Sequence, residues 1–544
     1  MCQFQFKLHL IMARFDPLTK IFHGKKVPQV YSPQASIGQV LLFNFHKSPE
    51  KVIQVSDDDG VALTCGQLSQ MMTVIAKNLV RLGCTFGDVA GIIGANTTFA
   101  APTLFGCFLV GITLSPLDVS FNVDQIVQVY RVTKPKLVFC DRELAKKVIS
   151  ALQILESDAR LVILTERIDG FLHISDLITE PQESAEWSME LGNSCDVCAV
   201  ILCTSGSTGV PKMARVSHAQ FLHPFTLNQS HENSFSLNFS SFYWLTGFSN
   251  IIFLALNCQK RLVTTRQFSP DTAFDLIEKY KLSVMFLLPP HVILLVESPR
   301  FQTADLSSIK VFTTGGLFTS EQLRRTLQGR LANGKVCIGY GMTEVGGIIT
   351  ETDPSDAISS SVGKPTVNSQ IKILIDDGTT GSLYDIGEIL VRKPMKFLGY
   401  CGTAHSTVED HDGWIYTGDM GFIDEKLEIH VVGQRTFVIK NFYNEIFPNE
   451  IEEVIQRIPG VQSVCVVGTP DTEQTEGPSA FVVKHPEIVV TEDDVRDTTS
   501  HLDTFKHIRD VFFVESLPVA PSGKLQRRLI KEMAEEMKIL RQGN

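Results

Sequence analysis

Two alternating patterns of apolar residues run along most of the chain. Short apolar runs, such as residues 137–140, are separated by stretches with helical spacing, such as residues 68–82. Short runs predict buried strands, and a period of about 3.6 residues predicts amphipathic helices. Strands that alternate with helices form parallel sheets covered by helices, so we predict an α/β fold. The same short runs return at residues 198–203, 261–264, 284–287 and 311–313.

One stretch, between Asp88 and Asp118, holds no charged residue and has to be weighed as a membrane span. Polar Asn96 and the helix breakers Pro102 and Pro116 interrupt it, which argues against a bilayer-crossing helix. We predict a buried β-α-β unit instead and no transmembrane segment. The unit would consist of a strand at 89–93, a turn at Asn96, a helix from Thr98 and a strand at 112–117.

The pattern changes twice towards the C-terminus. After Gly363 strands and turns dominate, which predicts a β-rich subdomain, and after residue 432 helices and strands form a small α+β unit. A chain of 544 residues exceeds what one core usually supports. We therefore predict a large N-terminal domain, residues 1–432, and a small C-terminal domain, residues 433–544. Strands are expected at 370–375, 387–391, 427–432, 461–468, 479–484 and 511–514, and helices at 448–457 and 492–502.

Composition narrows the class of protein. The net charge of −11 argues against a nucleic-acid binder. The twelve cysteines are scattered, several in apolar runs, which is typical of reduced buried thiols, and the lone Cys195-x-x-Cys198 lacks a second pair at zinc spacing. Residues 1–14 lack a secretory cleavage pattern. We expect an intracellular protein.

A run of small hydroxyl residues and glycines follows one predicted strand. Thr204-Ser-Gly-Ser-Thr-Gly-Val-Pro-Lys212 comes directly after the apolar residues 199–203. Backbone N–H groups in such a run approach phosphate oxygens closely, and Lys212 adds positive charge. The run is not a Walker A loop, because Lys212 is followed by Met213 and not by Ser or Thr. We predict that it binds nucleotide phosphates through Thr204, Ser205, Gly206, Ser207, Thr208, Gly209 and Lys212.

Further runs follow in order: Thr314-Gly315-Gly316-Leu317, Gly339-Tyr340-Gly341-Met342-Thr343-Glu344, Gly413-Trp414-Ile415-Tyr416-Thr417-Gly418-Asp419 and Pro521-Ser-Gly523-Lys524. With the phosphate run they resemble the adenylate-forming superfamily of acyl-CoA synthetases, 4-coumarate–CoA ligases, beetle luciferases and peptide-synthetase adenylation domains. Over nearly its whole length the chain is similar to the insect luciferase-like acyl-CoA synthetases. The resemblance implies an N-terminal AMP-binding domain, a C-terminal lid, and the use of ATP, Mg²⁺ and CoA.

The resemblance also implies roles for single residues. Gly315, Gly316 and Gly341 would border the adenine, with Tyr340 stacked on it. Thr343 would hold the α-phosphate as a catalytic residue, and Glu344 would help bind Mg²⁺. An aromatic face suits a base, and a carboxylate oxygen is a ligand that Mg²⁺ prefers.

Two more roles complete the implied site. Asp419 would accept hydrogen bonds from the ribose hydroxyls, which a carboxylate can do with both oxygens. Lys524 would be the catalytic lysine, brought by the lid to stabilise the charge that builds on the α-phosphate oxygens.

The chain departs from the family at the hinge. The family usually has Asp-Arg-x-Lys-x-x-Ile-Lys, and here the run is Gly433-Gln434-Arg435-Thr436-Phe437-Val438-Ile439-Lys440. Gln434 can still hydrogen-bond to ribose but brings no charge, and Gly433 can serve as a pivot because glycine absorbs large backbone changes. Lys440 would assist the thioester step. Tyr443 stands where the family has a glycine beside the CoA channel, so thioester formation is less secure than adenylation.

The acid pocket should, by the resemblance, lie near residues 243–248 and 346–348. Leu245-Thr246 stand where luciferases carry two histidines, which favours an apolar acid, fatty or aryl. We thus expect an AMP-forming acid–CoA ligase that acts on a small carboxylic acid. The alternatives are a nucleotide-binding protein that has lost turnover and a luciferase-type monooxygenase. The compartment would be the cytoplasm, or by the resemblance the peroxisome, although the last residues are not Ser-Lys-Leu.

Overall fold

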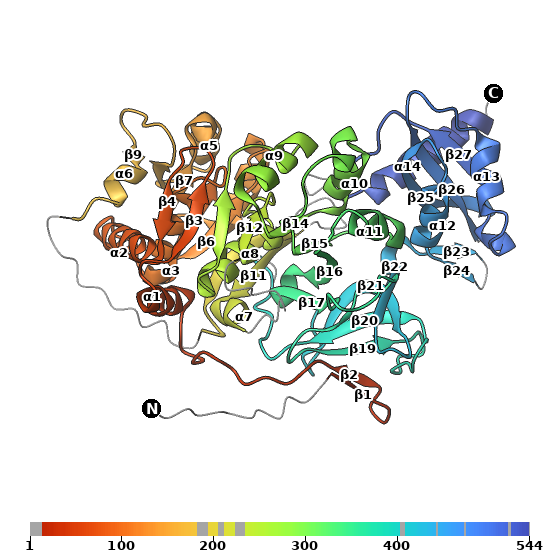
Figure 1. Ribbon diagram of the computed structural model, residues 1–544, viewed down its shortest axis with the longest axis horizontal. Coiled ribbons are helices and arrows are strands. Elements are labelled where there is room, and N and C mark those ends of the chain that lie inside the picture. Colours follow the sequence, from red (N-terminus) through yellow and green to blue (C-terminus); the bar gives the residue numbers. More distant parts are fainter. Residues whose placement is uncertain are drawn as a thin grey trace.

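The computed structural model arranges the chain as three large sheets with their helices and a smaller C-terminal part (Figure 1). This confirms the predicted α/β fold with a β-rich subdomain and a small α+β part. The structure describes residues 13–181, 194–204, 212–223, 234–402, 408–441, 444–472, 475–519 and 524–542.

The first sheet has the strand order β11-β10-β6-β5-β7-β8-β9. It contains the predicted β-α-β unit, because β5 and β6 pair in parallel and α3 connects them. Every residue of α3 is buried, since α1 and α2 pack on it, and this explains why the stretch carries no charge. The strands are β5 (Val89–Ile93), β6 (Thr113–Leu117), β7 (Leu137–Cys140), β8 (Arg160–Ile163), β9 (Leu172–His173), β10 (Cys198–Thr204) and β11 (Lys212–Ser217). The helices up to β11 are α1 (Ile37–Lys47), α2 (Cys65–Arg81), α3 (Ala100–Val110), α4 (Val123–Thr133), α5 (Ala145–Ile154) and α6 (Ile174–Leu177).

The second sheet has the order β18-β17-β16-β15-β14-β12-β13-β3-β4. Helix α8 packs on this sheet, where it contacts β13 and β17, and also contacts α1. The strands are β3 (Val52–Ser56), β4 (Ala62–Thr64), β12 (Phe235–Asn238), β13 (Lys260–Val263), β14 (Val284–Leu287), β15 (Val311–Gly315), β16 (Lys335–Met342), β17 (Gly347–Glu351) and β18 (Lys364–Pro365). The helices are α7 (His218–Leu222), α8 (Leu245–Leu256), α9 (Pro270–Tyr280), α10 (Pro289–Glu297) and α11 (Glu321–Gln328).

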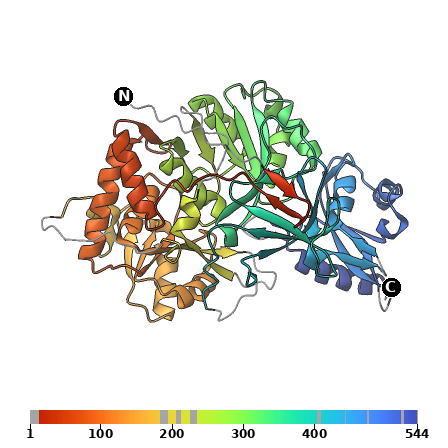
Figure 2. The same ribbon diagram turned by 90° about the horizontal axis from the view of Figure 1, so that it is seen from below.

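The β-rich subdomain is an antiparallel sheet in the order β1-β2-β19-β20-β21-β22. The N-terminal hairpin β1–β2 completes it by pairing with β19, and Figure 2 shows this hairpin against the subdomain. A hairpin so far from β19 in sequence could not be assigned to this sheet beforehand. The strands are β1 (Arg14–Asp16), β2 (Ile21–His23), β19 (Gln370–Leu374), β20 (Gly387–Arg392), β21 (Ile415–Ile423) and β22 (Ile429–Gln434).

The C-terminal part has its own apolar core on both faces of a three-stranded sheet. Helix α14 is tied to α12 by an ion pair, Arg527 Nη2 to Glu452 Oε2 at 2.7 Å. The domain boundary that we place at 432/433 falls inside β22 and stays a proposal. The elements are β23 (Ile439–Asn441), β24 (Asn444–Ile446), α12 (Pro448–Ile455), β25 (Val461–Thr472), β26 (Thr475–Lys484), α13 (Glu492–Thr499), β27 (Asp510–Phe513) and α14 (Arg527–Gln542).

None of the helices in the described ranges combines the length and apolar character that a bilayer crossing needs. Each cysteine in those ranges is free of disulfide bonds.

Candidate active site

The two ends of the phosphate run face each other across a hairpin. β10 ends at Thr204 and β11 begins at Lys212, and these two residues are register partners in the antiparallel pair. Ser205, Gly206, Ser207, Thr208 and Gly209 lie outside the described residues. The hairpin therefore fixes where the run starts and ends, at one edge of the first sheet.

Lys212 belongs to a cluster with Tyr400 and Glu344. The ammonium of Lys212 lies 5.5 Å from the centre of the Tyr400 ring. The Tyr400 hydroxyl donates a hydrogen bond of 2.5 Å to Glu344 Oε1, and Glu344 is buried. Burial, followed by the Glu344 charge, raises the pKa of Tyr400. Thr343 precedes Glu344 in the same turn, so both predicted residues stand beside the end of the phosphate run.

Sequence reasoning missed Tyr400. It reaches the cluster because the segment around it pairs with β11: the Arg215 N–H donates to the Gly399 carbonyl at 3.0 Å, and the Cys401 N–H to the Met213 carbonyl at 2.8 Å. A single tyrosine after a glycine is no signal in itself. Only the pairing of two segments far apart in sequence places it there.

The predicted adenine glycines let backbone segments pack closely. β15 and β16 are parallel neighbours with Gly315 opposite Gly339, and a Cβ on Gly315 would lie 2.1 Å from the Gly339 carbonyl oxygen. Gly316 has a φ of +84°, which side-chain-bearing residues rarely adopt. A Cβ on Gly341 would lie 2.4 Å from the Gly347 carbonyl oxygen. These positions require glycine whether or not a base is bound.

Tyr340, Asp419 and Gln434 meet at the edge of the β-rich subdomain. The Tyr340 hydroxyl donates to Asp419 Oδ2 at 2.7 Å, and Gln434 Nε2 donates to Asp419 Oδ1 at 3.2 Å. Asp419 of β21 and Gln434 of β22 are register partners, which explains the second contact. Burial raises the pKa of Asp419, and the hydrogen bonds from Tyr340 and Gln434 oppose this rise.

Lys524 of the C-terminal part interacts electrostatically with the same carboxylate. Its positive charge is one of the influences that lower the pKa of Asp419, against the larger effect of burial. Residues 521–523 of the lysine loop lie outside the described residues. The structure thus brings Lys524 into electrostatic range of the predicted ribose carboxylate.

Arg435 does not join Asp419. Its Nη1 lies 2.7 Å from Oε2 of the buried Glu388, whose Oε1 accepts a hydrogen bond of 3.0 Å from the Gly418 N–H. Arg435 therefore stabilises the turn before Asp419 through Glu388. Of Gln434 and Arg435, Gln434 is the one that contacts the Asp419 carboxylate.

Lys440 is an exposed residue of β23 in the C-terminal part. Its backbone N–H donates to Glu476 Oε2 at 3.4 Å, within the same part. It is thus not among the groups gathered around Asp419. Phe442 and Tyr443 lie outside the described residues.

The predicted acid pocket region is aromatic and buried. Phe248 of α8 packs against Phe108 and Phe221, with ring centroids 6.2 Å and 5.5 Å away. Gln220 lies against Gly346, where a Cβ would be 2.7 Å from the Gln220 Cβ. Burial lowers the pKa of His218 to about 3, so this histidine is neutral. The side chains around Phe248 are therefore aromatic, and the histidine beside them is uncharged.

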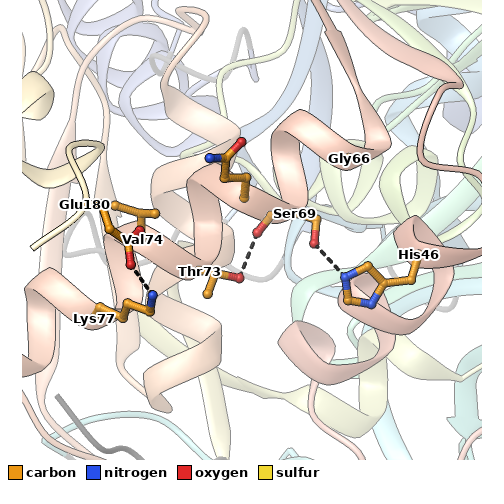
Figure 3. A pocket seen from close by; sticks show the side chains of 8 residues that line it. His46, Gly66, Ser69, Thr73, Val74, Lys77 and Glu180 are labelled. Atoms are coloured by element: carbon orange, nitrogen blue, oxygen red, sulfur yellow. Dashed lines mark hydrogen bonds and ion pairs between the residues drawn. The ribbon is translucent and has the colours of Figure 1, made fainter. Parts of the chain in front are cut away.

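Two other clusters have a structural explanation. Asp424, Glu428 and His430 could hold a metal ion by spacing, but the Asp424 carboxylate accepts the N–H groups of Lys426 and Glu428 in a hairpin turn. In a surface hollow on α2, Ser69 Oγ lies 3.3 Å from His46 Nε2 (Figure 3). Within the described ranges no carboxylate contacts His46, so this pair lacks the third group of a catalytic triad.

Comparisons with known proteins agree with this geometry. The chain matches the family model of the AMP-binding enzyme over residues 43–401 and that of the AMP-binding enzyme C-terminal domain over residues 450–524. It is 27% identical to 4-coumarate-CoA ligase 1 of Narcissus pseudonarcissus, over 93% of this chain and 95% of that one.

Solved structures share the fold. The anthranilate CoA ligase AuaEII in complex with anthranoyl-AMP matches with a TM-score of 0.83 at 20% identity, covering 94% of this chain and 99% of that chain. The luciferase-like enzyme of the nonluminescent mealworm Zophobas morio matches with a TM-score of 0.70 at 23% identity, covering 76% and 98%. The resemblance seen in the motifs is thereby confirmed. The chain belongs to the AMP-binding enzyme family, as an AMP-forming acid–CoA ligase that uses ATP, Mg²⁺ and CoA.

Proposed function

We propose that the acid activated by this ligase is apolar, fatty or aryl, and that the groups around Asp419 and Glu344 carry out its adenylation. The observation that carries the proposal is the meeting of three separate segments at one carboxylate: Asp419 accepts from Tyr340 and Gln434 and is influenced by Lys524. Adenylation needs a cation at the α-phosphate of ATP, and a lysine within electrostatic range of the proposed ribose ligand Asp419 supports that role for Lys524.

The residues around Glu344 fit a Mg²⁺ ion. Glu344 is buried, and Tyr400 occupies its Oε1, while among the described residues its Oε2 accepts no side-chain or backbone hydrogen bond. A buried carboxylate with a spare oxygen, in the same turn as Thr343, offers the hard oxygen ligands that Mg²⁺ takes. When bound, the ion would neutralise charge on the phosphates of ATP.

In the adenylation step a carboxylate oxygen of the acid attacks the α-phosphorus of ATP, and pyrophosphate leaves. Lys524 and Thr343 would donate hydrogen bonds to the α-phosphate oxygens, where negative charge grows. Tyr340 and Asp419 would hold adenine and ribose, so that the phosphorus stays in line with the acid.

Several observations support an apolar acid. In the region of the proposed pocket, Phe248 packs with Phe108 and Phe221, and the buried His218 beside Phe108 is neutral. Apolar walls stabilise each buried methylene by about 0.8 kcal/mol. Relatives named as ligases of 4-coumarate and anthranilate support the aryl option.

In the second step the CoA thiolate attacks the acyl carbonyl and AMP leaves. Lys440 lies away from Asp419 in this structure, which is consistent with use after a rotation of the C-terminal domain about Gly433. We propose the domain boundary of 432/433 on the same ground. Tyr443 in place of glycine predicts a slower transfer to CoA.

A panel of acids tests the proposal. With ATP and Mg²⁺ we expect pyrophosphate release in which each methylene that enters the pocket raises kcat/KM by about fourfold. Addition of CoA should then give the thioester. Release with no acid in the panel would favour a nucleotide-binding protein without turnover, and release only with polar acids would contradict the apolar pocket. Light emission with oxygen would favour the monooxygenase alternative.

Tyr400→Phe tests the Glu344 site. The change removes the hydrogen bond that orients the carboxylate and keeps the ring beneath Lys212. Because partners that orient a metal ligand contribute strongly to affinity, we expect the Mg²⁺ concentration for half-maximal ATP binding to rise about tenfold. Calorimetric titration of ATP at several Mg²⁺ concentrations measures it. Tyr416→Phe, a tyrosine of β21, is the control, and an equal effect there would refute the assignment.

A further inference from the structure

A pocket of about 490 Å³ lies between the segment that follows β2 and the end of β20, and neither Glu344 nor Asp419 lines it. The side chains that line it include His23, Lys26, His223, Arg392 and Lys393. None of its lining residues, all of which the structure describes, is Asp or Glu. In a chain of net charge −11, a pocket whose charged lining groups are all basic needs an explanation.

The two central cations lack ion-pair partners in the described ranges. Arg392 Nε donates to Gln370 Oε1 at 2.7 Å and Nη1 to the Asp412 carbonyl at 3.3 Å, which leaves Nη2 without a protein acceptor among the described residues. Lys393 Nζ donates to the Ile348 carbonyl, and two of its three N–H groups remain. Both side chains therefore keep donors for a ligand.

The pocket of Figure 3 provides a contrast. Its lysine, Lys77, is ion-paired with Glu180, so the charge of that lysine is compensated. Lys393 differs because burial lowers its pKa to about 8, and the charge of Glu351 only partly opposes this. Burial of an ammonium without a paired counter-charge is unfavourable, and an anion would relieve it.

The part of the pocket lining next to Lys26 is held in place by paired hydrogen bonds. The Val27 N–H donates to Asn368 Oδ1 at 3.0 Å, and Asn368 Nδ2 donates back to the Val27 carbonyl at 2.9 Å. These bonds fix the residue next to Lys26 to Asn368, and both Val27 and Asn368 line the pocket. The cations thus line one cavity, and hydrogen bonds hold part of its lining in place.

We propose that this pocket binds a phosphate group, with Arg392 and Lys393 as its principal donors and Lys26 at its rim. A phosphate carries nearly two negative charges and three acceptor oxygens, which match two cations with at least three unused N–H groups. The volume also admits the remainder of a small phosphorylated molecule. The phosphate could come from free phosphate or from CoA, and both share this chemistry.

The experiment is calorimetric titration of the full chain with inorganic phosphate. Arg392→Gln should weaken phosphate binding roughly tenfold or more, because a charge-assisted hydrogen bond is lost. Lys26→Gln, at an exposed position, should weaken it about threefold. Lys372→Gln is the matched control, since Lys372 and Arg392 lie over the same Trp414 ring, at 4.4 Å and 4.6 Å, and only Arg392 lines the pocket.

Further measurements distinguish this pocket from the nucleotide site and identify the molecule that supplies the phosphate. Lys212→Gln should leave phosphate binding at this pocket unchanged, because Lys212 belongs to the nucleotide run. Displacement of phosphate by CoA but not by dephospho-CoA would identify the 3′-phosphate of CoA as the source, and displacement by neither would identify free phosphate. Absence of phosphate binding to the native chain, or binding that survives both Arg392→Gln and Lys26→Gln, would overturn the proposal. Because binding is measured without turnover, the result does not depend on the proposed function.

Discussion

Replacement of Lys524 by alanine should lower the rate of acyl-adenylate formation by a factor of about 10²–10³ and change the dissociation constant of ATP by less than roughly threefold. The reason lies in where charge develops. Negative charge grows on the α-phosphate oxygens in the transition state, so an ammonium placed there stabilises the transition state more than bound ATP. Lys524 is exposed and comes from the C-terminal part, whereas Tyr340 and Asp419 belong to the N-terminal sheets.

Two measurements on the same variant separate the effects. Single-turnover pyrophosphate release gives the adenylation rate, and calorimetric titration with ATP and Mg²⁺ gives affinity. Arg528→Ala is the control, because Arg528 is an exposed cation of the neighbouring helix α14 paired with Glu532. Unchanged release in the Lys524 variant, or the same loss in the Arg528 variant, would show that the lysine has no special position.

Much of the fold followed from local patterns. The uncharged stretch between Asp88 and Asp118 was predicted as a β-α-β unit, and the structure confirms it, because a helix packed on all sides has no place for charge. The helices predicted at 448–457 and 492–502 exist but end earlier, at Ile455 and Thr499. The ends of these helices are set by competing turns, which the spacing of apolar residues does not indicate.

The sequence could predict those site residues whose role needs one residue type at a fixed place in a motif. Asp419 and Tyr340 come from motifs far apart in sequence, and the structure places them in hydrogen-bond contact. Contacts that arise from pairing between distant segments could not be predicted from the sequence. Tyr400 reaches Glu344 only because its segment pairs with β11. Arg435, directly after β22, reaches Glu388 of β20 only because both strands pair with β21.

The pocket at Arg392 could not be predicted from the sequence for the same reason. Its cations come mainly from two short basic runs that are far apart in sequence, at residues 23–26 and 392–393, and neither run alone indicates that they line one pocket. Convergence in space, and the lack of carboxylates in the pocket lining, are properties of the fold.

Asp419→Asn should weaken ATP binding by a factor of about 10 to 100, since hydrogen bonds to a charged group contribute roughly 1.5–3 kcal/mol. Each Asp419 oxygen already accepts one hydrogen bond, from Tyr340 or from Gln434, and keeps a second lone pair for a ribose hydroxyl. Asparagine has the same shape, but its NH₂ group cannot accept. One of the two protein donors would then face another donor, and one ribose hydroxyl would lose its acceptor.

The nucleotide sugar makes this prediction specific. The native chain should bind ATP about tenfold or more tightly than 2′,3′-dideoxy-ATP, while the Asp419→Asn substitution should reduce that preference to roughly threefold or less, as expected when both partners of one interaction are removed. Asp410→Asn is the control, because the Asp410 carboxylate accepts the Trp414 N–H at 2.8 Å in the turn before β21 and has no proposed contact with ribose. An equal preference in the native chain and the Asp419→Asn variant would mean that Asp419 holds the strands together and does not contact the sugar.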